Sequence, residues 1–362
     1  MALIDVKIVR DALKQGKAER IKGGFDETKI EYIRFRSPHG GIGRGTVIAG
    51  KRVIWGFPHI KRIFTLEKGL KKNMTGGTIF AEEKIDGFNV RIASIDGSIC
   101  AFSRGGFLDL FVTEKAREMK LERFFINNPN YIICGEMIGN TPHTDPTDKF
   151  DVKLFVFDID TGDGSYLPCE KKYSLLNKYS LQSVPVLGKF MADDYAGLHK
   201  LAISLNKGMK EGMVLKSADR RNVLKYVMPN ADLDDISKTS SLLFDMPIGF
   251  FYQRVLRSAF FINDFDLDKD KYAAMLGRAF YSGLSKSIRK VKRGEEIDDE
   301  FEILIKDLRI WDDIKHNMGK AVKLDLLWKR SEKGKTRIRF RKIYRNTTKK
   351  LTSFASGKGV TD

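Results

Sequence analysis

The sequence has 362 residues and a formal net charge of +18, with 42% hydrophobic and 31% charged residues. This composition excludes a largely disordered chain, and the length predicts two or three domains. No apolar run approaches the roughly 20 residues that span a bilayer, and the N-terminus lacks the charged-then-apolar order of a secretory signal. We therefore expect a cytoplasmic protein without membrane contacts.

The first two regions are rich in strand patterns. Residues 1–75 combine an opening helical segment with short strands and the glycine-rich loop HGGIGRG, and they predict a small β-rich N-terminal domain. Residues 76–233 alternate apolar and polar residues, which predicts an antiparallel sheet with helices chiefly at 112–124 and 171–180. The predicted strands are, in chain order, GGTIFAEEKI, NVRIASI, ICAFSR, YIICGEMIG, KLFVFDI, EGMVLKS and VLKYV.

The pattern changes beyond Pro229, where apolar residues recur at helical spacing. Residues 234–305 are predicted to form a helical domain and residues 306–362 a basic C-terminal domain, so the fold class is α+β. The aromatic stripe of the helical domain is larger than one short helical hairpin needs for its own core, so we expect it in the core or in a homodimer interface. Its members are Phe244, Phe250, Phe251, Phe260 and Phe261.

More than half of the net charge lies near the C-terminus. Residues 328–350 contain eleven lysines or arginines and one acid, Glu332, which gives +10. Arg337, Arg339 and Arg341 alternate with apolar residues, as on a strand with one basic face, but the same segment also fits one side of a helix. This charge favours contact with a nucleic acid over a solvated tail, because a polyanion releases its condensed counterions on binding.

A candidate reactive residue, Lys84, lies in the stretch EEKIDGFNVR between two predicted strands. KxDG alone is a weak signal, since it also describes a solvated hairpin turn. Five further motifs follow in order, and together they make the signal strong. They are FSRGG at 102–106, CGEMIG at 134–139, LFVFDID at 154–160, EGMVLK at 211–216 and LKY at 224–226.

This ordered series resembles the covalent nucleotidyltransferase superfamily of ATP-dependent DNA and RNA ligases and mRNA capping enzymes. The N-terminal region and the helical C-terminal half further resemble the archaeal homodimeric RNA ligases, which include RNA-circularising enzymes. The resemblance implies an antiparallel-sheet nucleotidyltransferase domain, ATP-grasp-like, that uses ATP with Mg²⁺ or Mn²⁺. It also implies that single-stranded RNA with 5′-phosphate and 3′-hydroxyl ends is joined through lysyl-AMP and adenylated RNA.

The same resemblance assigns roles to individual residues. Lys84 corresponds to the nucleotide-bearing nucleophile, and Asp86 is expected to orient it or the incoming 3′-hydroxyl. Glu136 resembles the glutamate that contacts the ribose, and Phe157 resembles the aromatic residue that stacks on adenine. Glu211 resembles the acid that coordinates the metal, for which hard carboxylate oxygens are suited.

The remaining predicted site residues surround the phosphates and the nucleotide. A lysine has a pKa of about 10.4 in water and must lose a proton before it attacks. Neighbouring cations favour that loss, and the predicted ones are Lys216 and Lys225. The superfamily's last motif often contains two lysines, whereas this chain has only Lys225 there, and Lys216 is the candidate replacement. The other predicted nucleotide-binding residues are Glu82, Glu83, Asn89 and Arg104.

Other functions fit parts of the sequence. DNA ligases and capping enzymes usually continue into an OB-fold with an RxDK motif, but this chain becomes helical after residue 234 and has no such motif. A second alternative is a non-catalytic RNA-binding protein with a decayed ligase domain. The presence of the lysine, the metal-binding acid and the stacking aromatic favours an active RNA ligase.

Overall fold

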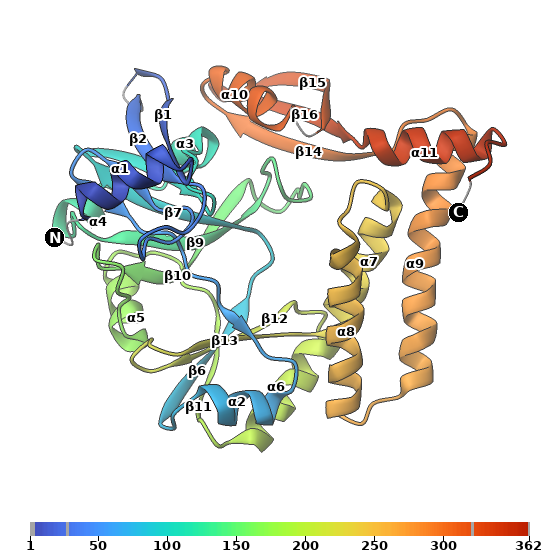
Figure 1. Cartoon of the computed structure of the whole chain (residues 1–362), viewed down its shortest axis with the longest axis horizontal. Helices are drawn as coiled ribbons and strands as arrows, with labels where there is room; N and C mark the ends of the chain where they lie inside the picture. Colours follow the sequence, from blue (N-terminus) through green and yellow to red (C-terminus); the bar gives the residue numbers. More distant parts are fainter. Residues whose placement is uncertain (1–3, 27–28, 320–321, 361–362) are drawn as a thin grey trace.

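The computed structural model describes residues 4–26, 29–319 and 322–360. Its centre consists of two sheets, one above the other in Figure 1. The first central sheet contains, in spatial order, β10 (Val152–Asp160), β9 (Ile132–Gly139), β7 (Phe88–Ile95) and β8 (Ser98–Ser103). The second central sheet contains β11 (Val186–Met191), β6 (Thr78–Lys84), β12 (Gly212–Ser217), β13 (Val223–Val227) and β5 (Lys61–Arg62). All pairs are antiparallel except β13 with β5.

Alternation along the strands gives the second central sheet one apolar and one polar face. In β6, Ile79 and Ala81 lie in a hydrophobic core, whereas Glu82 and Lys84 line a cavity on the other side. The strands β12 and β13 follow the same rule, since their core residues alternate with residues that line the cavity. The polar face is therefore turned towards the first central sheet, from which the other wall of the cavity comes.

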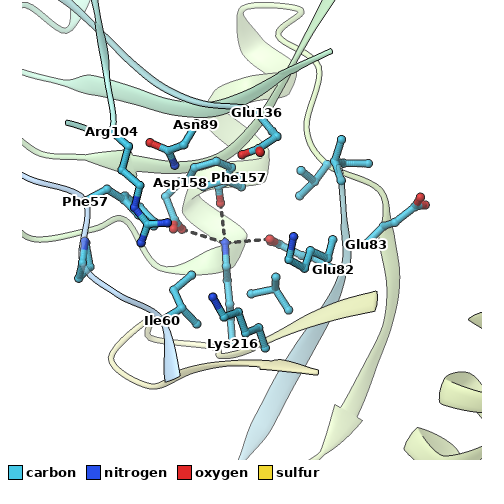
Figure 2. A pocket seen from close by; sticks show the side chains of 16 residues that line it. Phe57, Ile60, Glu82, Glu83, Asn89, Arg104, Glu136, Phe157, Asp158 and Lys216 are labelled. Carbon is cyan, nitrogen blue, oxygen red and sulfur yellow. Dashed lines mark hydrogen bonds and ion pairs between the residues drawn. The ribbon is translucent and has the colours of Figure 1, made fainter. Parts of the chain in front are cut away.

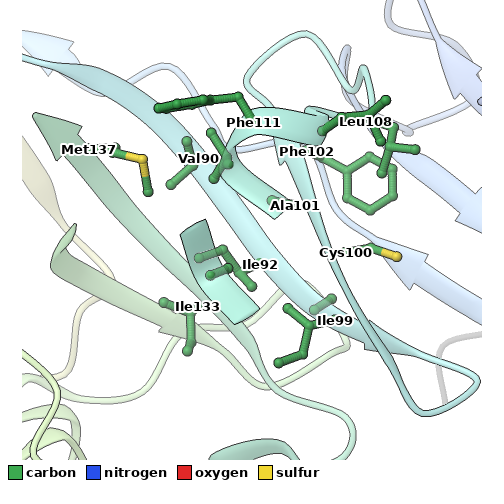
Figure 3. Packing of buried hydrophobic residues seen from close by; sticks show 14 of the residues in the cluster. Val90, Ile92, Ile99, Cys100, Ala101, Phe102, Leu108, Phe111, Ile133 and Met137 are labelled. Carbon is green, nitrogen blue, oxygen red and sulfur yellow. The ribbon is translucent and has the colours of Figure 1, made fainter. Parts of the chain in front are cut away.

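The apolar side of the first central sheet forms the largest core. Figure 3 shows Val90 and Ile92 of β7 beside Ile133 and Met137 of β9, with Phe111 of the neighbouring helix α3 (Leu110–Glu118). The core also includes residues of α4 (Glu122–Asn127) and α5 (Cys169–Lys178). It continues into the N-terminal sheet, which has the order β1 (Ala18–Gly23), β2 (Ile30–Phe35), β3 (Val47–Ala49) and β4 (Arg52–Ile54).

Two further helices cover the second central sheet. The helices α2 (Leu66–Asn73) and α6 (Tyr195–Lys207) contribute buried residues to its core. Phe261 and Phe265 of the helical region belong to the same core. The first helix, α1 (Val6–Lys14), packs separately against the N-terminal sheet through Ala12.

The helical region stands beside the two sheets, and the C-terminal sheet lies above it (Figure 1). The helical region contains α7 (Pro229–Thr239), the 3₁₀ turn Ser240–Leu242, α8 (Ile248–Asp264) and α9 (Lys269–Lys292). The C-terminal sheet has the order β14 (Asp298–Ile305), β16 (Lys335–Ile343) and β15 (Lys323–Glu332). Two helices accompany it, α10 (Arg309–Met318) and α11 (Arg345–Ala355). None of the described helices has both the length and the apolarity needed to cross a bilayer.

The predicted α+β class with antiparallel sheets is confirmed, and each of the seven predicted strand segments contains a strand. The helix prediction was incomplete. The segment predicted as one helix at 112–124 is two helices, α3 and α4, because Lys120 between them has a φ of 55°, which interrupts the helix. The helix α6 was not predicted, although Asp194 caps its first turn.

Two predicted domain boundaries divide sheets. The boundary at residue 75 separates β5 and α2 from the second central sheet, with which they pair and pack. The boundary at residue 305 separates β14 from β16, although the two strands pair along their whole length. The segment around Arg337, for which strand and helix were both open, is the central strand of this sheet. The domain boundaries and the structure around Arg337 depend on which distant strands pair, and local sequence patterns do not contain this information.

Candidate active site

A cavity lies between the two central sheets (Figure 2). Nine of the eleven predicted site residues line it, although they come from six separate stretches of the chain. They are Glu82, Glu83, Lys84, Asn89, Arg104, Glu136, Phe157, Lys216 and Lys225. The other two, Asp86 and Glu211, are close to Lys84, which contacts Glu211 and acts electrostatically on Asp86. The fold thus brings the predicted residues together.

Strand register explains why the lysines of the cavity lie near one another. Val214 of β12 pairs with Glu82 of β6 on one side and with Lys225 of β13 on the other. Side chains at paired positions share one face of a sheet, and so do residues two positions along a strand. Lys84 and Lys216 are each two residues from this row and therefore face the same cavity.

Lys84 is the last residue of β6, and its Nζ donates a hydrogen bond to Glu211 Oε1. Burial raises the pKa of Glu211 to about 7, against the opposing effect of the Lys84 charge. Glu211 Oε2 is buried and has no hydrogen-bond partner among the described residues. Burial, with a contribution from Asp235, also raises the pKa of Asp86. Glu211 can therefore accept a proton near neutral pH, and one of its oxygens is available to a ligand.

Close packing explains the glycine of the KxDG motif. A Cβ atom on Gly87 would lie 2.4 Å from the carbonyl oxygen of Met137 and 2.6 Å from Ile138 Cγ2. A larger residue would displace this loop from β9, the strand that contains Glu136. The loop that follows Lys84 is therefore held directly against the first central sheet.

Lys216 is fully buried among three acceptors. Its Nζ donates to Asp158 Oδ1 at 2.9 Å and to the carbonyl oxygen of Phe157 at 2.6 Å, and it lies 2.8 Å from Glu82 Oε2 (Figure 2). Two hydrogen bonds and one ion pair therefore hold the Lys216 ammonium group within the protein. The contacts argue against the predicted α-phosphate role of Lys216 and favour the positioning of Phe157 and Glu82.

Sequence reasoning missed the residues that complete this buried network. They are Asp158, Lys172, Tyr173 and Arg220. Lys172 and Tyr173 of α5 both donate hydrogen bonds to Glu82 Oε1. Arg220 donates two hydrogen bonds to Asp158. Burial raises the pKa of Asp158, but the positive charges of Lys216 and Arg220 outweigh burial and lower this pKa to about 2. The sequence did contain a signal for this network: Asp158 lies within the apolar strand LFVFDID, and a buried charge requires a partner.

Lys225 has different surroundings from Lys216. Burial, followed by the charges of Arg62 and Lys84, lowers the pKa of Lys225 to about 8. No carboxylate pairs with it among the described residues, and its side chain lines the cavity. Lys225 is therefore better placed than Lys216 to bind an anion.

The first central sheet supplies the opposite wall. Asn89 of β7 pairs with Glu136 of β9, and both side chains line the cavity together with Arg104 and Phe157. Burial raises the pKa of Glu136 to about 7. Asn89 Oδ1 is buried without a hydrogen-bond partner among the described residues. This wall therefore combines an aromatic ring with polar groups, of which Asn89 Oδ1 is free to bind a ligand.

The predicted metal ligand stands apart from other candidate ligands. No group of three or more His, Cys, Asp or Glu residues in the described part of the chain is arranged to hold a metal ion. Mg²⁺ is often bound through one or two carboxylates together with substrate phosphates and waters. The unpartnered Oε2 of Glu211 fits one ligand of such an ion.

The predicted basic face of β16 is not open. Arg337 pairs with Glu302 and Glu332, Arg339 with Glu300, and Arg341 with Asp325 and, at 3.4 Å, with Glu296. Most of these acids lie in β14 and β15 or beside them, so neighbouring strands neutralise the arginines. The three arginines of β16 are therefore not free cations.

Comparison with known proteins is consistent with this geometry. Residues 77–227 match the RNA ligase family, and residues 238–358 match the family described as ligase Pab1020 C-terminal region. The uncharacterized protein MJ0414 of Methanocaldococcus jannaschii is 30% identical over 355 residues, which cover 92% of this chain and 89% of that protein. The chain belongs to the RNA ligase family. The ligase motifs lie within the first matched region, and so do the cavity residues except Phe57, Pro58 and Ile60, which precede it.

Solved structures resemble the ligase along its whole length. A putative ATP-dependent DNA ligase from Aquifex aeolicus has a TM-score of 0.90 and 31% identity, covering 98% of this chain and 99% of that one. An archaeal ATP-dependent RNA ligase has a TM-score of 0.88 and 27% identity, covering 97% and 96%. The match therefore includes the N-terminal sheet, the helical region and the C-terminal sheet of the ligase.

Proposed function

We propose that this protein is an ATP-dependent RNA ligase that joins 5′-phosphate and 3′-hydroxyl ends of single-stranded RNA. The observation that carries the proposal is that Lys84 lines the cavity, contacts Glu211 and lies near Lys225. A lysine amine beside a proton acceptor and a second cation suits covalent nucleotide transfer. The reaction proceeds through lysyl-AMP and then adenylated RNA.

In the first step, Lys84 Nζ attacks the α-phosphorus of ATP. Lys84 gives up its ammonium proton to Glu211, whose pKa of about 7 makes it an acceptor near neutral pH. The N–P bond forms as the bond from the α-phosphorus to the bridging oxygen breaks, and pyrophosphate leaves with the electron pair. The second amine proton passes to solvent, and Lys225 stabilises the charge on the phosphate oxygens.

The cavity walls hold the nucleotide. Phe157 offers its ring to adenine, and Lys216 fixes this residue by binding its carbonyl oxygen. Glu136, paired with Asn89, faces the ribose from the opposite sheet. Glu211 would hold a Mg²⁺ or Mn²⁺ ion through Oε2, the oxygen that has no partner among the described residues, and such an ion would neutralise charge on the phosphates.

In the later steps, AMP passes from Lys84 to the RNA 5′-phosphate, and a 3′-hydroxyl then displaces AMP. Asp86 is the acid beside Lys84 that orients the incoming hydroxyl, and its raised pKa suits a group that exchanges protons. Arg104 presents a planar set of donors that matches phosphate. When both ends belong to one strand, the product is a circle.

Sealing assays with α-labelled ATP test the proposal directly. Wild-type protein with Mg²⁺ is expected to acquire a covalent label from ATP and not from GTP, which excludes a capping enzyme. It is then given 5′-phosphorylated single-stranded RNA, the equivalent DNA and a nicked duplex. Preferred sealing of the RNA supports the proposal, whereas preferred sealing of the nicked DNA duplex overturns it in favour of a DNA ligase. Absence of any label supports the decayed, RNA-binding alternative.

We also propose that the protein is a homodimer that uses α8. Ile248, Tyr252, Leu256 and Phe260 recur every four residues on this helix, and each is at least 42% exposed. Residues at this spacing form one stripe, and a continuous apolar stripe on a helix surface is typical of an interface. A second copy of the same helix provides a self-complementary partner. The aromatic residues Phe251 and Phe261, by contrast, are buried within the chain.

Tyr252→Glu tests the dimer, because it places a charge at the centre of the stripe. Sedimentation velocity is expected to show a wild-type dimer and a variant monomer, with label transfer from ATP retained. Lys271→Glu, which changes an exposed residue at the start of α9, is the control. A wild-type monomer at micromolar concentration contradicts the proposal.

A further inference from the structure

The short strand β5 extends the row of side chains at the floor of the cavity. Arg62 of β5 pairs with Lys225 of β13, which pairs with Val214 of β12, which pairs with Glu82 of β6. Neighbours in this row point to the same face of the sheet. Arg62 therefore faces the side of the sheet that forms the cavity, one strand beyond Lys225.

Arg62 lacks the partners that the arginines of the C-terminal sheet have. Its Nε is buried without a hydrogen bond, and no carboxylate forms an ion pair with it among the described residues. Burial, followed by the nearby charge of Arg257, lowers its pKa. The nearby acid Asp232 is already bound by Arg257 through two hydrogen bonds. A partly buried guanidinium in these surroundings is stabilised by an anion from outside the chain.

The position of Arg62 relative to Lys84 indicates which anion this is. The two residues stand on β5 and β6, which are separated by three strand spacings, or about 14 Å. In an in-line transfer the leaving group departs on the side of the phosphorus opposite the nucleophile. An attack from Lys84 across Lys225 therefore releases the leaving group towards β5.

We propose that Arg62 binds the β- and γ-phosphates of ATP and the pyrophosphate that leaves when Lys84 becomes adenylated. This inference rests on the proposed ligase function for its chemical step, although the anion site itself can be tested without it. The planar guanidinium offers paired donors that match two oxygens of a pyrophosphate. Because the later steps do not involve pyrophosphate, Arg62 is needed for the first step and its reversal and not for sealing.

The chain provides a matched control on the same strand. Lys61 precedes Arg62, pairs with Leu224 and so points to the opposite face of the sheet, where its Nζ lies 3.4 Å from Asn73 Oδ1. Arg62→Gln and Lys61→Gln each remove one positive charge from β5. Only the first removes it from the cavity side. Arg62→Lys retains the charge but loses the paired donors.

Four measurements on the full-length protein test the proposal. Calorimetric binding of pyrophosphate to the unadenylated protein is expected to weaken about tenfold in Arg62→Gln, to weaken less in Arg62→Lys and to be unchanged in Lys61→Gln. The ATP concentration for half-maximal labelling, and the pyrophosphate concentration that releases AMP from the labelled protein, are expected to rise by a similar factor. Sealing of an already adenylated RNA is expected to stay within twofold of wild type.

The outcomes separate this inference from the ligase function. Unchanged pyrophosphate binding in Arg62→Gln overturns the inference even if the protein is a ligase. Equal losses in labelling and in sealing of adenylated RNA also overturn it, since they indicate a contact to RNA or to AMP. If wild-type protein takes no label but pyrophosphate binding still depends on Arg62, the ligase function fails while the anion site stands. Thermal unfolding of each variant shows whether the fold is retained, and Arg62→Lys provides the comparison if Arg62→Gln does not fold.

Discussion

The second central sheet and the C-terminal sheet both contain rows of basic residues, but within the part of the chain that the structure describes only the row in the C-terminal sheet is paired with acids. In the C-terminal sheet, Arg337, Arg339 and Arg341 each contact acids on or beside the flanking strands. In the second central sheet, Lys225 and Arg62 lie side by side with no ion-pair partner among the described residues. The C-terminal row has the higher charge density in the sequence, yet the central row has the unneutralised charge.

The difference is visible in the pKa values of the two rows. The hydrogen bonds that Arg337 and Arg341 donate to neighbouring acids raise the pKa of both arginines, because an acidic partner stabilises the charged form. Burial and like charges instead lower the pKa of Lys225 to about 8. A cation that is costly to keep charged gains most from an incoming anion, so the central row is the better candidate for phosphate binding.

The largest expected effect comes from Lys84→Ala. Label transfer from ATP is expected to fall by at least about a thousandfold, because the nucleophile is gone. Sealing of an already adenylated RNA is expected to survive, since that step does not use the amine. The matched variant in the other sheet, Arg339→Ala, is expected to label normally. Equal loss of labelling and sealing in Lys84→Ala would indicate a structural role for this lysine.

The next effect concerns the acid that contacts Lys84. Glu211→Gln is expected to slow label transfer by about 100-fold, or about 2.7 kcal/mol, because it removes both a proton acceptor and a hard oxygen ligand. The Mn²⁺ concentration for half-maximal labelling is expected to rise as well. Glu300→Gln, which removes the acid that pairs with Arg339, is the control. An unchanged metal requirement in Glu211→Gln contradicts the metal-binding assignment.

The pH dependence of labelling tests the unneutralised lysine. Below pH 7, protonation of Glu211 and Glu136 is expected to reduce the rate, since burial raises both pKa values to about 7. Above pH 8, Lys225 loses its proton and the rate is expected to fall again. Lys225→Arg keeps its charge, so the alkaline decline is expected to move upward while the acidic one stays. A wild-type profile in this variant shows that another group controls the alkaline side.

The smallest effect is expected from substitutions in β16, whose arginines are paired with acids. The triple variant Arg337→Gln, Arg339→Gln, Arg341→Gln is expected to lower the melting temperature by about 2–4 °C, because partly exposed ion pairs contribute little each. RNA affinity, measured by a salt titration, is expected to keep its slope. If the arginines do contact RNA, the log–log slope changes by about two units, since each phosphate contact contributes about 0.7. That result would reverse the comparison between the two sheets.

Local patterns in the sequence contain much of the fold. The alternation that predicted a strand before Lys84 also determines which side chains of β6 face the core and which face the cavity. The ordered series of motifs led to the prediction of eleven site residues, and nine of them line one cavity. The helix α6 and the two-residue strand β5 were missed. A strand of two residues is too short for any periodicity, and β5 exists because it pairs with β13.

The sequence by itself determined the faces of the long strands and the residue types around the candidate lysine, Lys84, because these depend on side chains a few positions apart. Only the tertiary structure decided which charges remain unpaired. Lys216 is held by residues about 60 and 130 positions away, Asp158 and Glu82, while the arginines of β16 are neutralised by acids of separate strands. Arg62 lies next to Lys225, a residue of the cavity, through a strand pairing that spans more than 160 residues. Charge in a sequence can be counted, but whether it is available to a ligand depends on long-range packing.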